Sequence, residues 1–214
     1  MKYKVILFDL DGTLTDPQQG ICRSINYALE HFGAQPKPLC QLTKYIGPPL
    51  RDSFAELLGE ENAEAAVAKY RERFSVTGLY ENEIYPNVKE TLELLQQKGY
   101  ILCTASSKPQ IFVEKILKHF EIDKYFSIIG GASLDGKIGE KEDVINLVIK
   151  QLAADRKEIV MVGDTRFDLI GAQKMQLDAI GVTYGFGSEQ ELSRYPHIAL
   201  ISDISHIVNI LQQE

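Results

Sequence analysis

The sequence predicts an α/β fold, with a doubly wound parallel sheet and a helical segment inserted after its first strand. Two observations lead to this prediction. Short apolar runs without polar–apolar alternation recur along the chain, which is typical of strands buried on both faces of a parallel sheet. Amphipathic helical patterns separate most of these runs, and strands that alternate with helices form parallel βαβ units.

The first predicted strand is Tyr3–Phe8, an uninterrupted apolar run that reads YKVILF. The helical pattern is clear in Val88–Lys98, where apolar side chains fall on one face and Gly99 can end the helix. The further predicted strands are Tyr100–Thr104, Phe126–Ile129, Ile159–Val162, Ala179–Val182 and Ile198–Ile201, and the further predicted helices are Ile111–Phe120, Asp143–Leu152, Asp168–Met175 and Ile204–Leu211.

Residues 17–84 interrupt the alternation. Helical spacing of apolar side chains appears in Gly20–Phe32, Leu50–Leu58 and Ala63–Phe74, with proline-rich loop sequence between the first two. The segment contains no convincing strand. We therefore expect a core domain made of residues 1–16 and 85–214, and a helical domain of residues 17–84.

The composition is that of an ordinary globular protein with an acidic balance. The 214 residues carry 23 basic and 30 acidic side chains, a net charge of −7. Such a field repels nucleic acids and anionic membranes, so we expect neither as a partner. A small anionic substrate stays possible, because a bound cation can invert the potential inside a pocket.

The cysteines and the N-terminus favour the cytoplasm. Cys22, Cys40 and Cys103 are widely spaced and lack metal-site or redox spacing, which predicts free, buried thiols in a reducing compartment. The first apolar run is too short, and too soon followed by acidic residues, for a signal peptide or a membrane span.

Two carboxylates follow the first predicted strand in the motif Asp9–Thr13, which reads DLDGT. Ligands of open α/β sheets bind beyond the carboxyl ends of the strands, so Asp9 and Asp11 mark the expected site. Acids this close repel each other unless a cation intervenes, and Mg²⁺ prefers oxygen ligands. A solvated turn is the simpler alternative for the DLDG tetrapeptide alone.

A second acidic motif, Gly163–Asp168, also follows an apolar run directly. If its strand neighbours the first, Asp164 can meet Asp9, and converging carboxylates again require a cation. Helix capping would explain Asp164 or Thr165 alone, but not the pairing of the two motifs. A later glycine pair, in Gly185–Ser188, is interpreted as a turn after the fifth strand.

Together these motifs resemble those of the haloacid dehalogenase-like (HAD) phosphohydrolases, and the resemblance extends over essentially the whole chain. It implies a Rossmann-like core with an inserted all-helical cap, a Mg²⁺ cofactor, and hydrolysis of small phosphorylated metabolites. Asp9 would be the nucleophile that becomes phosphorylated. Asp11 would be the general acid and then the general base. Asp9, Asp164 and the backbone carbonyl of Asp11 would hold the metal.

The other two family motifs, a serine or threonine and a lysine, each have more than one candidate residue in this sequence. Ser106 and Ser107 are expected to bind the phosphoryl oxygens, and Asp168 to orient the motif lysine or a metal-bound water. Lys141 matches the family's K-x-x-x-I register, although Glu142 stands where the family often has proline. Lys137 is the alternative motif lysine.

Other readings stay open at this point. The acid at position 11 favours a phosphatase or phosphomutase over a dehalogenase. A receiver domain would be shorter and phosphorylated on a later strand, and a regulator without turnover would not need all four motifs. GPPLRDSF, residues 47–54, is similar to the branch of 5′-nucleotidases and phosphoglycolate phosphatases, and Arg51 within it is a candidate substrate anchor. We expect a 5′-nucleotidase first, and a monomer or homodimer.

Overall fold

The core of the protein is a six-stranded parallel sheet. The computed structural model describes residues 2–135 and 137–213. The strands lie in the order β5-β4-β1-β6-β7-β8, and every neighbouring pair is parallel. Their bounds are β1 Val5–Phe8, β4 Ile101–Pro109, β5 Phe126–Ala132, β6 Ile159–Gly163, β7 Asp178–Val182 and β8 Ala199–Ile201. The prediction of a doubly wound parallel sheet is confirmed.

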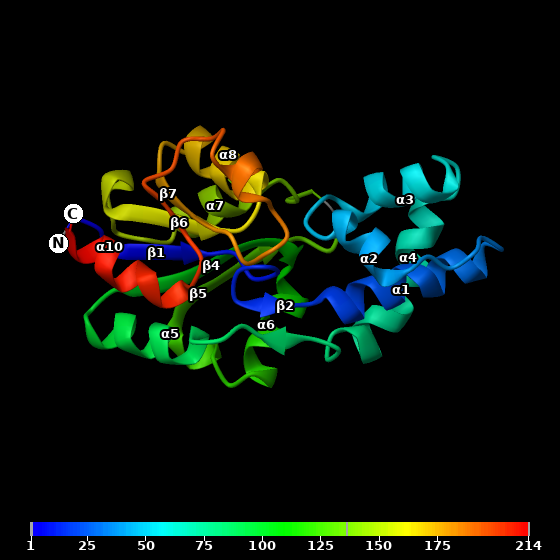
Figure 1. Ribbon diagram of the computed structural model, residues 1–214, viewed down its shortest axis with the longest axis horizontal. Coiled ribbons are helices and arrows are strands. Elements are labelled where there is room, and N and C mark those ends of the chain that lie inside the picture. Colours follow the sequence, from blue (N-terminus) through cyan, green and yellow to red (C-terminus); the bar gives the residue numbers. More distant parts are fainter. Residues whose placement is uncertain (1, 136, 214) are drawn as a thin grey trace. The chain divides into compact units, whose positions relative to one another are not determined.

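Helices cover both faces of this sheet (Figure 1). On one face α7, Lys141–Ile149, and α8, Arg166–Lys174, pack against the central strands. The other face is covered by α5, Val88–Gln97, α6, Gln110–His119, and α10, Ile207–Gln213. The strands are buried from both sides: all four residues of β1 and all five of β6 are buried. This double burial is the reason that the strands read as uninterrupted apolar runs.

The chain reverses its direction of travel across the sheet beside β1. After β1 it fills the positions of β4 and β5 on one side, then crosses to β6, β7 and β8 on the other. The switch between β1 and β6 leaves an open position at the carboxyl ends of these two strands, where α/β proteins bind ligands. The topology therefore places the residues that follow β1 and β6 side by side.

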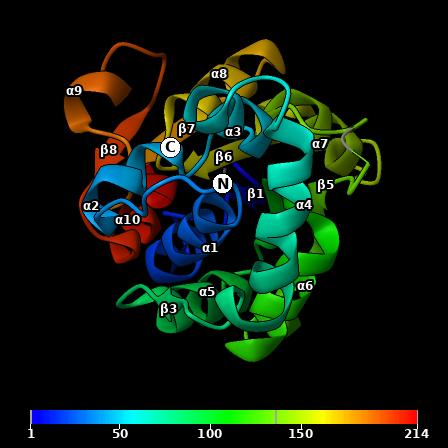
Figure 2. The ribbon, with the colours of Figure 1, turned by 90° about the vertical axis from the view of Figure 1, so that its right-hand side faces the viewer.

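Residues Asp16–Glu83 form a second compact unit, and the remaining described residues form the first. Within the second unit, α1 (Gln18–His31) packs against α4 (Ala63–Arg73), and α4 packs against α3 (Leu50–Leu58), as Figure 2 shows. A short helix α2, Leu39–Leu42, joins α1 to a one-turn helix at Thr43–Tyr45, and a π-helical turn, Phe74–Gly78, follows α4.

Several details differ from the sequence-based expectations. A two-stranded sheet joins β2 (Thr15–Asp16) to β3 (Glu83–Ile84), so the expectation of no strand in residues 17–84 was wrong; a two-residue strand is too short to show a periodicity. Cys22 and Cys103 are buried free thiols, but Cys40 is exposed on α2, which corrects the prediction of three buried cysteines. Among the described residues, no helix is both long enough and apolar enough to cross a membrane.

Candidate active site

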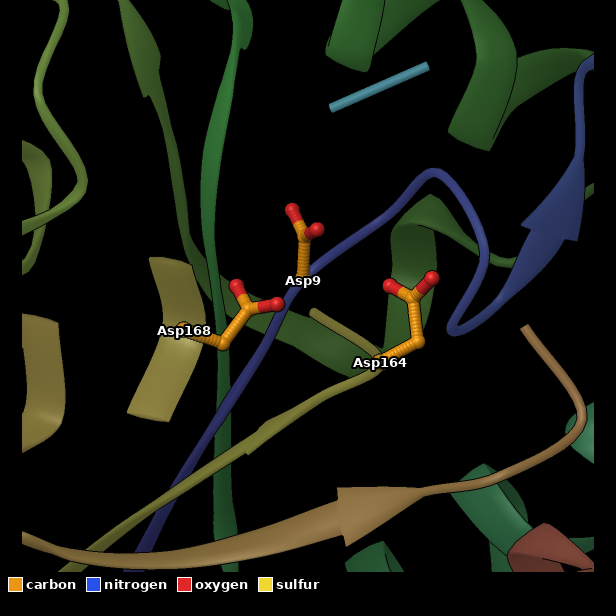
Figure 3. Close-up of side chains that lie close together, drawn as sticks. All are labelled: Asp9, Asp164 and Asp168. Carbon is orange, nitrogen blue, oxygen red and sulfur yellow. The ribbon is translucent and has the colours of Figure 1, made fainter. Parts of the chain in front are cut away.

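Strand register brings Asp9 and Asp164 together. Phe8, the last residue of β1, pairs with Thr104 of β4 and with Val162 of β6. Asp9 follows directly, and its backbone N–H donates to the Val162 carbonyl at 2.9 Å. Asp164 lies two residues beyond Val162, so both carboxylates emerge at the same edge of the sheet. Figure 3 shows these two side chains, with Asp168 from α8, turned toward a common space.

The turn after β1 is shaped around Asp164. Gly12 has a φ of +84°, and a Cβ atom at this position would lie 2.0 Å from Asp164 Oδ2. Only glycine permits both the left-handed backbone and this approach. The Thr13 hydroxyl donates to Asp164 Oδ1 at 3.2 Å. The DxDGT motif therefore positions its own carboxylates and also fixes the carboxylate that follows β6.

Lys141 is the lysine that reaches the site. It is the first residue of α7, where the sequence had predicted a helix beginning two residues later. Its Nζ lies 2.8 Å from Asp9 Oδ1 and 2.7 Å from Asp168 Oδ1, and only 4% of its side chain is exposed. It also donates to the Ala105 carbonyl. Lys137 is exposed and pairs with Asp135, so it lies outside this group.

Electrostatics keep Lys141 charged. Burial alone would lower the pKa of its ammonium group, but the carboxylates of Asp168 and Asp9 outweigh burial and raise that pKa above its ordinary value. The ammonium is a fixed positive charge at neutral pH, next to the proposed nucleophile. It can therefore bind an anionic oxygen without having to gain a proton first.

Asp168 supports this lysine and also caps its own helix. Its Oδ2 accepts from the Thr165 N–H at 2.9 Å and from the Thr165 hydroxyl at 2.8 Å, which forms a capping box at the start of α8. Its Oδ1 faces Lys141. Because Thr165 and Lys141 already engage both oxygens, the contacts favour an orienting role for Asp168 over a role as a metal ligand.

The two serines after β4's apolar run differ in their surroundings. Ser106 is buried, and its hydroxyl oxygen accepts from the Lys108 backbone N–H at 3.3 Å. Ser107 is half-buried. The strand was expected to end at this point, but β4 continues to Pro109 with a register shift between Ser106 and Pro109. This irregular segment lies at the same sheet edge as the carboxylates, since Thr104 pairs with Phe8.

Three contacts of the site were missed by the sequence analysis. Lys108 Nζ lies 2.5 Å from Asp11 Oδ2, with 6% of the lysine side chain exposed. The loop after β7 is more than a turn, because its Phe186 N–H donates to Asp164 Oδ2 at 2.8 Å. In the same loop, the Tyr184 hydroxyl donates to the Thr13 carbonyl at 2.8 Å. The sequence offered two signals for these contacts. One is a lysine two residues after Ser106, and the other is the pair of glycines that follow β7, the strand beside β6.

The charges of the site could be balanced by a divalent cation. Six largely buried residues make up a group that we name the carboxylate cluster: Asp9, Asp11, Asp164, Asp168, Lys108 and Lys141. Its four carboxylates and two ammonium groups together carry a formal charge of −2. Oxygen atoms of three of these acids lie within 4.8 Å of one another. Burial, and then the charges of Asp168 and Asp9, raise the pKa of Asp164 well above its ordinary value.

The donor atoms fit such an ion. Asp11 Oδ1 is buried and accepts no hydrogen bond from any residue that the structure describes, whereas Asp9 Oδ1 and Asp168 Oδ1 share one donor, the Lys141 ammonium. Buried carboxylate oxygens in excess of their donors are the hard, anionic ligands that Mg²⁺ or Ca²⁺ takes. The residues present could therefore hold a metal through Asp9 and Asp164.

Arg51 does not belong to the carboxylate cluster. It is an exposed residue of α3, and its guanidinium contacts Glu60 at 2.8 Å and Glu64 at 3.1 Å, both within the helical unit. A substrate carboxylate or phosphate would have to compete with these two partners. The sequence-based candidacy of Arg51 as a substrate anchor stays a prediction.

A parallel α/β sheet with carboxylates and a buried lysine at its switch point is an arrangement typical of the active sites of α/β enzymes. Comparison with known proteins gives the class more closely. The model of the haloacid dehalogenase-like hydrolases matches residues 6–182, so the chain belongs to that family.

Individual relatives carry several names. A 5′-nucleotidase of Pseudomonas aeruginosa is 42% identical, over 99% of this chain and 97% of the relative. The tyrosine-protein kinase PtkA of Mycobacterium tuberculosis is 34% identical, over 97% of this chain and 73% of the relative. A phosphoglycolate phosphatase of Haemophilus influenzae is 30% identical, over 98% of this chain and 99% of the relative.

Solved structures agree with this placement. A crystal structure described as a predicted phosphatase from Clostridium acetobutylicum covers 100% of both chains, with a TM-score of 0.95 and 40% identity. Hydrolysis of a phosphate monoester is the activity that the family, the 5′-nucleotidase, the phosphoglycolate phosphatase and the Clostridium acetobutylicum structure support in common.

Proposed function

We propose that this enzyme is a Mg²⁺-dependent phosphatase of small phosphorylated metabolites, with Asp9 as its nucleophile. The observation that carries the proposal is the convergence of the carboxylate cluster at the switch point. Asp9 lies at the end of a rigid, fully buried strand, with Lys141 at 2.8 Å and Asp164 close by. A fixed cation beside a carboxyl nucleophile is an arrangement suited to receiving a phosphoryl group.

The reaction divides into two displacements. A carboxylate oxygen of Asp9 attacks phosphorus, the bond from phosphorus to the ester oxygen breaks, and the departing oxygen takes a proton from Asp11. Water then attacks the phosphoaspartate, giving a proton to Asp11, and the bond to Asp9 breaks. Inorganic phosphate and an alcohol leave, and both aspartates return to their starting states.

The other residues bind and orient. Ser106 and Ser107 with the Lys141 ammonium would hold the phosphoryl oxygens, and Asp168 would hold Lys141 in place. Asp9, Asp164 and the Asp11 backbone carbonyl would bind Mg²⁺. The ion, when bound, would neutralise charge on the phosphoryl oxygens.

We assign substrate selection to residues 17–84, acting as a cap domain on a core of residues 1–16 and 85–214. Specificity sites are commonly grafted onto a shared catalytic core, and insertions are one way to do this. GPPLRDSF, residues 47–54, is the proposed contributing segment. We further propose a cytoplasmic enzyme, either monomeric or homodimeric.

A nucleoside monophosphate is our first choice of substrate. The support is the 42% identity to the 5′-nucleotidase across almost the whole of both chains. Phosphoglycolate is the alternative, favoured by the full-length relative of that name. A panel of phosphometabolites compared by kcat/KM decides between them: a preference of tenfold or more, about 1.4 kcal/mol, for phosphoglycolate would reject the first choice.

The central test is phosphate release from an aryl phosphate with and without Mg²⁺. Asp9→Asn should lose activity by several orders of magnitude while keeping its fold, because the amide is isosteric but is not nucleophilic. Asp155→Asn is the matched control, since Asp155 is exposed and an asparagine can still cap the turn at Arg156–Glu158. Full turnover by Asp9→Asn would reject the proposed nucleophile. Phosphate delivered to a tyrosine instead of water would favour the activity named for PtkA.

A further inference from the structure

The carboxylate of Asp11 is held by one of its two oxygens. Lys108 Nζ lies 2.5 Å from Asp11 Oδ2, and the two side chains are only 6% and 14% exposed. Asp11 Oδ1 is buried and accepts no hydrogen bond from the described part of the chain. The two oxygens of this carboxylate therefore have different surroundings: Oδ2 is held by Lys108, and Oδ1 has no hydrogen-bond donor among the described residues.

The backbone around Lys108 is built to bring the lysine to this position. The Lys108 N–H donates to the Ser106 hydroxyl oxygen at 3.3 Å. A Cβ atom on Gly131 of the neighbouring strand would lie 2.9 Å from the Lys108 carbonyl oxygen, so β5 passes this segment at close range. The register shift between Ser106 and Pro109 lies at this place. A packed and hydrogen-bonded segment gives the lysine little freedom to move away from Asp11.

We propose that Lys108 is a positioning residue that holds Asp11 Oδ2 and thereby turns Oδ1 toward the leaving oxygen of the substrate. The inference rests on the proposed function, because it concerns the proton that Asp11 delivers. It extends that function to substrates with poor leaving groups, the alkyl phosphates, whose alkoxide must be protonated as it departs.

The proton balance is simple. As the bond from phosphorus to the ester oxygen breaks, the proton on Asp11 Oδ1 passes to that oxygen, and the attacking water returns a proton to Oδ1 in the second displacement. Lys108 keeps its own protons throughout. Its contribution is geometric, since a carboxylate free to rotate would present either oxygen in many orientations, and orientation of a catalytic group is worth a large part of its effect.

The test compares two substrates in Lys108→Met. On an alkyl phosphate we expect kcat/KM to fall about 100-fold, the lower end of what general acid catalysis supplies. On an aryl phosphate with a good leaving group, the same variant should lose at least tenfold less, because this group departs without a proton and only the removal of one positive charge from the site affects it. Lys118→Met, at an exposed position of α6, is the matched control and should behave as wild type on both.

A merely structural lysine would give a different result, because damage to the fold lowers kcat/KM equally on the two phosphates. Equal losses would overturn the inference. A loss confined to those alkyl phosphates that also carry a carboxylate would overturn it as well, because Lys108 would then be an anchor for the substrate itself.

Removing both charges of the pair keeps the test usable if Lys108→Met folds poorly. Asp11→Asn with Lys108→Met should match Asp11→Asn alone on the alkyl phosphate, since a residue that acts through Asp11 adds nothing once Asp11 is inactive. A further loss in the double variant would contradict the inference. If wild type hydrolyses neither phosphate, the proposed function fails. If wild type is active, unequal losses of kcat/KM in Lys108→Met on the two phosphates support the inference, and equal losses overturn it.

Discussion

Gly185→Ala is expected to inactivate the enzyme from a loop that carries no catalytic side chain. A Cβ atom at position 185 would lie 2.4 Å from Asp164 Cβ and Oδ2, and 2.4 Å from the Gly12 carbonyl oxygen. Ordinary contact begins at about 3.4 Å, so atoms on both catalytic motifs must shift by about 1 Å.

The size of the effect follows from that displacement. Overpacking of this kind costs about 1–3 kcal/mol of stability. A misplacement of about 1 Å in an active site can cost about 100-fold in rate. Because the displaced residue is Asp164, the Mg²⁺ concentration for half-maximal activity should also rise.

Gly99→Ala is the matched control. Gly99 has a φ of +86°, but its added Cβ would meet no described atom within 4 Å. The backbone conformation should cost about 1–2 kcal/mol, similar to the cost at position 185, without reaching the site. Urea unfolding and Mg²⁺ titrations of aryl phosphate hydrolysis give both quantities. A Gly185→Ala variant with wild-type rate and Mg²⁺ dependence would refute the packing that we describe around Asp164.

Three further predictions concern charge. Lys141→Met should lose about 3–5 kcal/mol of stability as well as activity, because it leaves buried carboxylates unpaired. Lys137→Met should stay within about 0.5 kcal/mol of wild type. Equal effects of the two variants in denaturant titrations would contradict the assignment of Lys141 as the lysine of the site. Burial and like charges raise the pKa of Asp164 and Asp168, so metal-free protein should lose stability as pH rises from about 4 through their folded pKa values. Stabilisation by Mg²⁺, about 2.7 kcal/mol at 100 times its Kd, should therefore grow as pH rises through the same folded pKa values, and thermal shifts that shrink as pH rises would be inconsistent with it. Arg51→Ala should leave stability close to that of wild type, because its ion pairs with Glu60 and Glu64 are exposed, and if it alters kcat/KM for no substrate, Arg51 is no substrate anchor.

The fold and the positions of the acids could be predicted because they depend on local sequence and on topology. Strands buried on both faces must be apolar throughout, so β1 and β6 are visible as uninterrupted runs. A carboxylate directly after each run then lies at the same sheet edge if the strands are neighbours. The adjacency of β1 and β6 supplies that condition for Asp9 and Asp164.

The contacts that were missed depend on geometry that one-dimensional patterns do not contain. Lys108 reaches Asp11 because β4 continues past its apolar run with a shift in register, and a register shift has no sequence signature. Phe186 contributes its backbone N–H, which any residue except proline carries. Burial of the Lys141 side chain, compared with exposure of Lys137, is likewise a property of the folded chain.

The most direct test of covalent catalysis at Asp9 is to trap the phosphorylated enzyme. Wild type would be mixed with a phosphate monoester and Mg²⁺, quenched in acid and reduced with borohydride, which converts an aspartyl phosphate to homoserine. Mass spectrometry of the peptide that contains residue 9 should show homoserine in place of Asp9, and only in samples that received substrate. Turnover without homoserine at position 9, or with homoserine at another aspartate, would contradict the account.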